Sequence, residues 1–339
     1  MDQPPKSILF IAVSRIGDTL FATPAMRAVA AAFPEAKITL LGHPKRAEVL
    51  EHLPWSHHVG AITKGRAAWM GRLGGTRYNL AFVFGFDEPL VAYALRVADK
   101  VVAFEQADSA LNARLRVAVP KPPFQSEHAV RQLLRLPAAL GVPPAGLRIA
   151  YRTTTDETAE ARRRLTEAGL ANARPLIGLQ VASFPTKAYR DWPIENFADL
   201  CGRILRRWPE AGFLIYGGSE EKNRTEWLKQ QLGPRAALFA GRLSLRQTAA
   251  LMALTDLYVG VDTGPTHIMS AFDIPMVGLY HCISPSSLTG PLDHPCAYLL
   301  DHPAGHDRCS ETAAMAEISV DAVFDQVERA LREHPPRPR

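Results

Sequence analysis

Residues 8–41, ILFIAVSRIGDTLFATPAMRAVAAAFPEAKITLL, contain the clearest fold signal in this chain of 339 residues. The apolar run Ile8–Val13 predicts a buried strand, and the SRIGDT segment that follows (14–19) predicts a loop. Ala22–Phe33 is rich in alanine and has helical spacing, and Ile38–Leu41 is a second apolar run. A strand, a helix and a strand in this order predict a βαβ unit within a parallel sheet.

The same alternation continues to the C-terminal part of the chain. Further strands are expected at 78–85, 100–104, 176–181, 212–216, 238–240, 257–261 and 276–280, and further helices at 194–207, 220–232, 245–254, 267–272 and 320–332. Two such halves predict two doubly wound, Rossmann-like α/β domains that face each other across a cleft. We place the first domain at 1–155, a linker at 156–175, the second domain at 176–320, and a C-terminal helix and tail at 321–339.

Composition narrows the class of protein. The chain is 47% hydrophobic and 22% charged, which is ordinary for a folded protein and excludes a mostly disordered one. No apolar stretch approaches the roughly 20 residues that a membrane span needs, so we expect a cytoplasmic protein. The four cysteines include no C-x-x-C pair, which favours thiols in a reducing compartment.

The positive charge lies in the first half of the chain. Residues 1–150 contain 18 Lys and Arg against 11 Asp and Glu, a net charge of +7, whereas the remainder has −2. This asymmetry favours an acidic partner, and an ordinary solvated basic face is the alternative. No zinc-finger or RNP motif accompanies the charge, so we expect no nucleic acid partner.

Two strand ends carry residues that suit a ligand. Asp18 follows the first strand, where G-x-G-x-x-G is absent, and is either a general base or, as spacing alone favours, a helix N-cap. Asp262, Thr263, Gly264 and His267 follow the strand at 257–261. Because these four converge at one strand end before a helix, a phosphate and sugar site is favoured over a capped helix.

Two further loops are weaker signals. Lys187 and Arg190 follow the strand at 176–181 and can neutralise a diphosphate, while Glu220 and Glu221 follow Gly217-Gly218 and can hold ribose hydroxyls. A turn followed by a charged helix start explains either loop equally well. The cluster at 281–309 (His281, Cys282, His294, Cys296, His302, His306 and Cys309) fits no zinc template, so loop histidines and buried thiols are favoured over a metal site.

Taken together, these segments resemble glycosyltransferase family 9, the ADP-heptose:lipopolysaccharide heptosyltransferases. The matching pieces are the N-terminal stretch 8–41, RDWPIENFADL (190–200), IYGGSEEKN (215–223), the segment 239–280 that contains DTGPTH, and SPSSLTGP (284–291). The start GD-x-L-x-x-x-P and the D-T-G-x-x-H motif are specific in combination. They fall in order across almost the whole chain.

The resemblance implies a GT-B fold, with the acceptor on the first domain and the sugar nucleotide on the second. It implies that Asp18 is the catalytic base, with Arg15 and Gly17 on the acceptor side. It also implies a donor site at Asp262, Thr263, Gly264 and His267, with a ribose-binding acid at Glu220 or Glu221. The family's Lys-x-Trp-Pro reads Arg190-Asp191-Trp192-Pro193 here, which leaves Arg190 or Lys187 as the cation that contacts phosphate.

The expected reaction is an inverting transfer of heptose from ADP-heptose, or a related sugar nucleotide, to a hydroxyl of the lipopolysaccharide core. The chain contains no D-x-D motif, so we expect neither a metal ion nor another cofactor. The acidic acceptor fits the basic first half and implies a peripheral location on the inner face of the membrane. The alternatives are a different glycan or protein acceptor, a sugar-nucleotide epimerase, or a catalytically idle carbohydrate-binding homologue.

Overall fold

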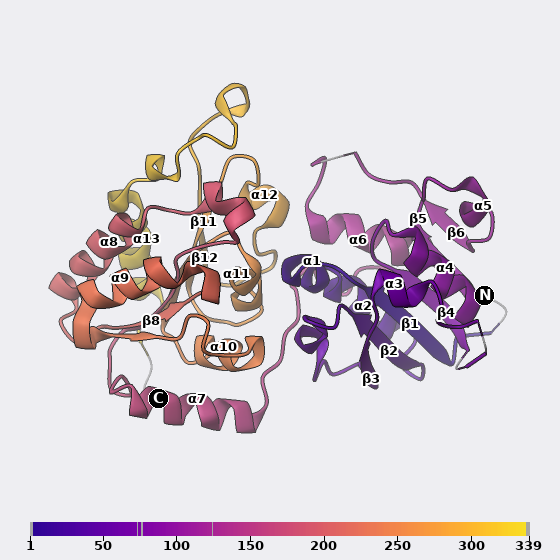
Figure 1. Cartoon of the computed structure of the whole chain (residues 1–339), viewed down its shortest axis with the longest axis horizontal. Helices are drawn as coiled ribbons and strands as arrows, with labels where there is room; N and C mark the ends of the chain where they lie inside the picture. The colour runs from indigo at the N-terminus through magenta and orange to yellow at the C-terminus, as the bar shows by residue number, and fades with distance from the viewer. Residues whose placement is uncertain (1–2, 73, 76, 124, 337–339) are drawn as a thin grey trace. The chain divides into compact units, whose positions relative to one another are not determined.

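The computed structural model describes residues 3–72, 74–75, 77–123 and 125–336. The chain separates into two compact units, Met1–Arg152 and Thr153–Arg339, each built around its own sheet (Figure 1). The second unit includes the segment 156–175 that we interpreted as a linker and the C-terminal helix. The linker role itself stays a prediction.

The first unit is a doubly wound parallel sheet of six strands in the order β3-β2-β1-β4-β5-β6. Its strands are β1 (Ser7–Ala12), β2 (Lys37–Gly42), β3 (His58–Ala61), β4 (Tyr78–Val83), β5 (Ala98–Phe104) and β6 (Val117–Val119). Its helices are α1 (Ile16–Phe21), α2 (Thr23–Ala32), α3 (Lys64–Ala67), α4 (Glu88–Val97), α5 (Ser109–Asn112) and α6 (Ala129–Ala138). The chain starts at the centre and winds outward in both directions, so the carboxyl ends of β1 and β4 meet at one edge.

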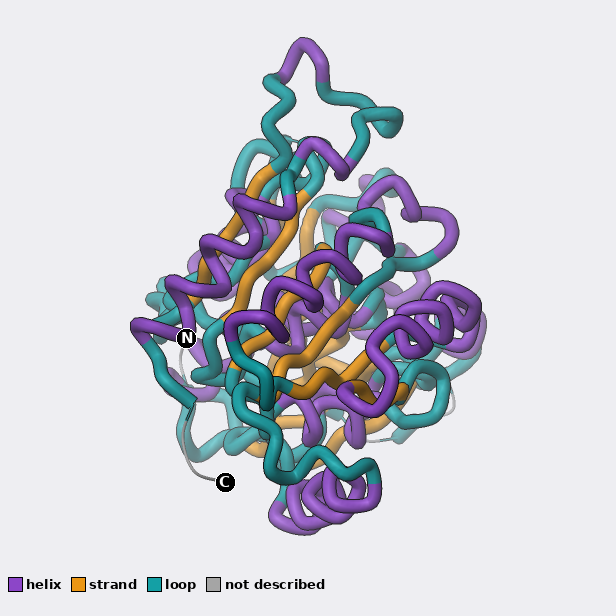
Figure 2. Tube along the Cα trace, turned by 90° about the vertical axis from the view of Figure 1, so that its left-hand side faces the viewer, coloured by secondary structure: helices purple, strands orange, loops and turns teal. Residues whose placement is uncertain are grey.

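The second unit repeats this topology, with the strand order β12-β11-β10-β7-β8-β9, all parallel. Its strands are β7 (Leu176–Gln180), β8 (Gly212–Tyr216), β9 (Ala236–Leu238), β10 (Leu257–Val261), β11 (Met276–Tyr280) and β12 (Ala297–Asp301). Its helices are α7 (Thr155–Glu167), α8 (Ile194–Arg207), α9 (Lys222–Leu232), α10 (Leu245–Met252), α11 (Gly264–Met269), α12 (Ser286–Thr289) and α13 (Val320–Glu333). Figure 2 shows its twisted strands with helices on both sides. Two doubly wound α/β units are therefore confirmed.

Several sequence-based predictions of local structure were wrong. The helix expected at 267–272 is Gly264–Met269. The segment 14–19 is not a loop throughout, because α1 begins at Ile16, and the ninth strand is Ala236–Leu238 rather than 238–240. The helix was missed because Gly17 and Thr19 interrupt the apolar spacing, although both are buried in α1. Burial against the sheet outweighs their weak helix propensity.

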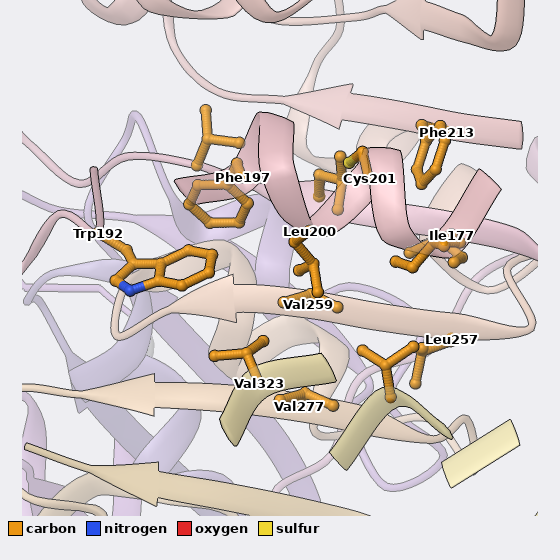
Figure 3. Packing of buried hydrophobic residues seen from close by; sticks show 14 of the residues in the cluster. Ile177, Trp192, Phe197, Leu200, Cys201, Phe213, Leu257, Val259, Val277 and Val323 are labelled. Atoms are coloured by element: carbon orange, nitrogen blue, oxygen red, sulfur yellow. The ribbon is translucent and has the colours of Figure 1, made fainter. Parts of the chain in front are cut away.

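One face of the second sheet is an apolar core. Phe197, Leu200 and Cys201 point from α8 onto strands that carry Val259 and Val277 (Figure 3). On the far side of the same cluster, Val323 and Val327 of α13 are fully buried. The alternating β7 and β10 residues on this face are isoleucine, leucine and valine, so the sheet is fixed in register from this side.

The opposite face of the second sheet is built from glycines and tyrosines. A Cβ atom at Gly178 would lie 2.9 Å from the ring of Tyr216, and one at Gly260 would lie 2.7 Å from the ring of Tyr258. The mid-strand glycines therefore make room for buried phenol rings. The Tyr258 hydroxyl lies 2.8 Å from Thr266 Oγ1, so this face also anchors α11.

Candidate functional site

Asp262 lies at the carboxyl end of β10 and is the centre of a buried polar cluster in the second unit. Only 1% of the residue is exposed. Its Oδ2 accepts hydrogen bonds from Arg190 Nη1 at 2.8 Å and from Ser284 Oγ at 2.9 Å. Its Oδ1 lies 3.3 Å from His267 Nε2. Three segments that are distant in sequence thus converge on one carboxylate.

The surroundings keep this carboxylate ionised. Burial alone raises the pKa of Asp262, but the hydrogen bond and charge of His267, together with Arg190 and Ser284, outweigh it and lower the pKa below its ordinary value. A buried charge of this kind holds its partners tightly, because separating them would leave it uncompensated. Asp262 therefore fixes the positions of Arg190 and His267.

The helix that carries His267 is fixed to the sheet from below. Thr266 Oγ1 donates to the carbonyl of Val261 at 2.6 Å and lies within hydrogen-bond distance of the Tyr258 hydroxyl. Thr263 precedes α11 in an extended conformation, and its side chain makes no capping hydrogen bond to the helix. The first-turn N–H groups, beginning at Gly264, are therefore not capped by that side chain. This geometry fits the predicted seat for a phosphate.

The loop that follows β7 supplies two cations. Asp191 holds this loop in place. It accepts hydrogen bonds from the backbone N and the Oγ of Ser183, both at 2.7 Å, and from Arg224 Nη1 at 3.1 Å. Burial raises the pKa of Asp191, against the effect of these hydrogen bonds. Lys187 Nζ lies 3.3 Å from the Tyr189 hydroxyl and, among the described residues, has no acidic partner. The charge of Arg190 is compensated by Asp262, whereas among the described residues the charge of Lys187 is not compensated.

The two glutamates after β8 differ in their surroundings. Glu221 folds back on its own loop and accepts a hydrogen bond from the backbone N of Gly218, and burial raises its pKa. Glu220 is exposed and has no hydrogen-bond partner within the described parts of the chain. Of the two predicted ribose-binding acids, Glu220 is thus the one with a carboxylate available to a ligand.

Asp18 lies in the first unit, in the first turn of α1. Arg15 occupies the N-cap position of that helix, so the interpretation of Asp18 as an N-cap is wrong. Asp18 is exposed, and its Oδ2 accepts one hydrogen bond, from Ser14 Oγ at 2.9 Å. It lines a cavity of about 390 Å³ whose other walls include Phe21, Phe86 and Gln132. Gly17, by contrast, is buried within α1 and does not line this cavity.

A second cavity of about 460 Å³ adjoins the first through shared walls at Val13, Ser14 and Asp87. Its basic lining consists of Arg15, His43, Arg46 and Lys64. Arg46 Nη1 donates to the carbonyl of Ser14 at 3.0 Å, and Lys64 forms an ion pair with Asp87. An exposed carboxylate and a basic hollow are therefore next to each other in the first unit.

The prediction that all four cysteines are free thiols is wrong for two of them. Cys282 and Cys309 form a disulfide, while Cys201 and Cys296 are free and buried. The long loop after β12 folds back on the end of β11, since His281 Nε2 donates to the Ala313 carbonyl and His302 Nε2 to that of Ala314. Contacts of this kind, between residues 12 to 32 positions apart, cannot be predicted from a local sequence pattern. The His306 side chain lies outside the described residues, and a metal-free segment 281–309 stays a prediction.

Two residues that hold the polar cluster of the second unit together were not predicted from the sequence. The sequence shows Ser284 only as part of SPSSLTGP, but its hydroxyl donates to Asp262. Arg224 was not singled out, although it holds both Asp191 and the carbonyl of Trp192, at 2.9 Å. Ser284 could have been found from its place just after β11, whereas Arg224 lies within a charged helix and gives no signal.

The profile of glycosyltransferase family 9 (heptosyltransferase) matches residues 91–315, most of the chain. The chain belongs to this family. Among its relatives, the lipopolysaccharide core heptosyltransferase OpsX of Haemophilus influenzae is 21% identical over 292 residues, covering 82% of this chain and 80% of the relative. This family member is accordingly a glycosyltransferase.

Solved structures agree with this assignment at the level of the fold. A family 9 glycosyltransferase from Veillonella parvula has a TM-score of 0.81 at 19% identity, with 97% of each chain covered. The Escherichia coli heptosyltransferase WaaC with ADP-2-deoxy-2-fluoro heptose has a TM-score of 0.71 at 18% identity, covering 95% of this chain and 99% of that one. The expected GT-B fold class is thereby confirmed. Within the described residues, no helix is both long and apolar enough to cross a membrane.

Proposed function

We propose that this family 9 enzyme transfers heptose from ADP-heptose to a hydroxyl of the lipopolysaccharide inner core, with inversion at the anomeric carbon and without a metal ion. The observation that carries the proposal is the buried Asp262 with Arg190, His267 and Ser284 arranged around it. Relatives named for lipopolysaccharide heptosyl transfer, and a similar structure that holds an ADP-heptose analogue, support the choice of substrates.

In the donor site, Arg190 and Lys187 are proposed to face the diphosphate. Arg190 is oriented by Asp262 and remains 21% exposed, while Lys187 offers an uncompensated ammonium group. Negative charge grows on the leaving phosphate in the transition state, and pre-oriented cations stabilise it there. The backbone N–H groups of Thr263 and Gly264, at the start of α11, add to this effect. Asp262 acts on Arg190 and His267 rather than on the sugar, because it is nearly inaccessible to solvent.

The same site has a place for the nucleoside. Glu220 lies in the loop that follows β8, after two glycines that permit close approach of a ligand to the backbone. Its free carboxylate is proposed to accept hydrogen bonds from the ribose hydroxyls. Glu221 instead shapes the loop through its bond to the Gly218 backbone N.

Asp18 is proposed as the general base. Its carboxylate is exposed, lines a cavity and, among the described residues, has a single side-chain partner, Ser14, so it is free to accept a proton from an acceptor hydroxyl. As the proton moves to Asp18, the hydroxyl oxygen forms a bond to the anomeric carbon. The bond from that carbon to the phosphate oxygen breaks on the opposite face, and ADP leaves. A single displacement of this kind inverts the configuration.

The acceptor is proposed to be anionic. The adjoining hollow with Arg15, Arg46 and Lys64 suits the acidic groups of a lipopolysaccharide core while the reacting hydroxyl reaches Asp18. Such an acceptor is anchored in lipid, so the enzyme is proposed to work at the cytoplasmic face of the inner membrane.

The test is to incubate the enzyme with ADP-heptose, with and without heptose-free lipopolysaccharide core, and to measure ADP release and the anomeric configuration of the product. The proposal predicts ADP release that depends on the acceptor, that continues in EDTA, and that yields the inverted anomer. Consumption of the donor without an acceptor would favour an epimerase. Transfer only to a neutral glycan or to a protein would reject the lipopolysaccharide acceptor.

A further inference from the structure

The turn that follows α3 exposes a tryptophan to solvent. Trp69 is 74% exposed, compared with 46% for Phe86 and 47% for Phe184, the other two exposed large hydrophobic residues of the described chain. Arg66 and Arg72 flank it and are exposed as well. We call Arg66, Trp69 and Arg72 the Trp69 patch. Most tryptophans are largely buried, so this degree of exposure calls for a physical reason.

The turn that carries Trp69 is held in place by Arg96 and by close packing at Gly71. Arg96 of α4 donates from Nε to the carbonyl of Met70 at 3.1 Å and from Nη2 to the carbonyl of Ala67. Gly71 adopts a positive φ of 76°, and a Cβ atom there would lie only 2.7 Å from Val97 Cγ1. These contacts fix the backbone on which Trp69 is presented. The exposed ring is therefore a feature of a defined turn.

The charge around the ring is positive and uncompensated. Among the described residues, Arg66 and Arg72 have no acidic partner, whereas nearby Arg77 is paired with Asp99 at 2.5 Å. The guanidinium carbon of Arg72 lies 5.2 Å from the centre of the Trp69 ring. Burial lowers the pKa of Arg96, and the neighbouring positive charge of Arg72 lowers it further.

We propose that the Trp69 patch docks the first unit on an anionic lipid surface, with the indole ring at the level of the headgroups. An indole is apolar with one polar N–H, and such rings favour the membrane–water interface, while arginines favour anionic lipids. An exposed tryptophan between two unpaired arginines therefore fits a lipid surface better than a purely acidic protein, which would have no use for the ring.

Docking through this patch would also orient the acceptor cavity. Thr63, Lys64 and Gly65, immediately before the patch, line the basic hollow next to Ser14. A lipid-anchored acceptor would then lie with its anionic sugars beside that hollow. Only this last step rests on the proposed function, because binding to a lipid surface is measurable without donor or acceptor.

The experiment is co-sedimentation of the full-length protein with vesicles of phosphatidylcholine alone or mixed with phosphatidylglycerol. We expect binding to the mixed vesicles to be roughly tenfold tighter or more, and to weaken with salt. Trp69→Ala should weaken it several-fold, and Arg66→Glu with Arg72→Glu roughly 30-fold, at about fivefold for each arginine lost from the surface. The control is Arg162→Glu with Arg163→Glu, which reverses two exposed charges on α7 and should leave binding unchanged.

A second readout locates the ring. Brominated phosphatidylcholine, mixed into the anionic vesicles, should quench part of the tryptophan fluorescence of the wild type, and Trp69→Phe should remove that quenching. Equal binding to neutral and anionic vesicles, or unchanged binding by both patch variants, would overturn the proposal. Capture of an acidic protein without vesicle binding would also reject it.

The outcome is separable from that of the proposed function. If vesicle binding depends on the patch while no heptose is transferred, docking stands and the proposed reaction fails. If heptose is transferred, Trp69→Ala should lose rate on vesicle-embedded acceptor and keep it on the lipid-free core oligosaccharide. Equal rates of this variant and the wild type on both acceptors would contradict docking at this patch.

Discussion

Asp18 and Asp262 each lie just beyond a central strand of a doubly wound sheet, yet their surroundings are opposite. Asp262 is 1% exposed and is contacted by an arginine, a histidine and a serine. Asp18 is exposed and has Ser14 as its one side-chain partner within the described chain. A buried, compensated carboxylate organises its neighbours, whereas an exposed one remains free to take a proton. The same residue type beyond two central strands is thus proposed to serve two purposes.

The sheets beneath these residues differ in the same way. Leu9, Ile11 and Val83 belong to an apolar cluster on the α4 side of the first sheet, and Phe10 stacks on Phe82 on its other side. In the second sheet, only one face is fully apolar. The other carries mid-strand glycines and buried tyrosine rings, and it continues into Asp262. A polar layer in the sheet interior supports a polar site at its edge.

The largest effect should come from the exposed aspartate. Asp18→Asn removes the proposed base and should lower kcat by roughly 10²- to 10⁴-fold, because an amide cannot accept the proton. Steady-state kinetics with saturating ADP-heptose measure it, and circular dichroism serves as the control for folding. A variant with nearly the wild-type kcat would place the base elsewhere.

A smaller but broader effect is expected at the buried aspartate. Asp262→Asn leaves Arg190 and His267 without their anchor, so kcat/KM for the donor should fall by roughly 10²-fold. The stability of the variant should also depend less on pH than that of the wild type. Since the pKa of Asp262 is lowered in the folded state, its contribution is present above about pH 4 and is lost as the pH falls through the folded value.

Thermal unfolding between pH 3 and pH 7 measures this second property. The wild type should lose more stability on acidification than Asp262→Asn does. Identical acid profiles for the two proteins, with the donor kcat/KM unchanged, would show that Asp262 does not hold a charged cluster.

Ionic strength should affect acceptor binding more than donor binding. The acceptor KM should rise several-fold between low salt and about 0.5 M salt, because exposed charges such as Arg15 are screened, whereas the donor KM changes less. Arg15→Glu should raise the acceptor KM at low salt in the same direction. An acceptor KM that changes neither with salt nor in the Arg15→Glu variant would favour a neutral acceptor.

The smallest effect distinguishes two neighbouring acids. Glu220→Gln should raise the donor KM by a few-fold, as expected for the loss of charge from one ligand hydrogen bond. Glu221→Gln keeps an oxygen that can accept from the Gly218 backbone N and should change the donor KM less. Comparing the two KM values tests the assignment, and the reverse order of effects would assign the ribose contact to Glu221.

Much of this organisation could be predicted from the sequence. The strands at 212–216, 257–261 and 276–280 and the start of α8 at Ile194 have the predicted bounds, because apolar runs and polar loops alternate there. The Asp262 segment stood out because four suitable residues follow one strand. Short edge strands such as Val117–Val119 were not predicted, since three residues give no periodicity.

What could not be predicted depends on contacts between distant segments. Ser284 reaches Asp262 across 22 positions and Arg224 reaches Asp191 across 33, and neither distance is encoded in a local pattern. The choice between Glu220 and Glu221 depends on how one loop folds back on itself. The exposed turn at Trp69 likewise requires Arg96, 27 positions away, to hold it in place.

The central claim is that Asp262 organises donor binding while Asp18 acts only on the acceptor. Isothermal titration of ADP-heptose into the wild type, Asp18→Asn and Asp262→Asn tests it most directly. We expect a wild-type Kd for Asp18→Asn and a Kd raised at least tenfold for Asp262→Asn, with all three proteins folded. An unchanged Kd for Asp262→Asn, or a similar loss of affinity in both variants, would contradict this division of roles.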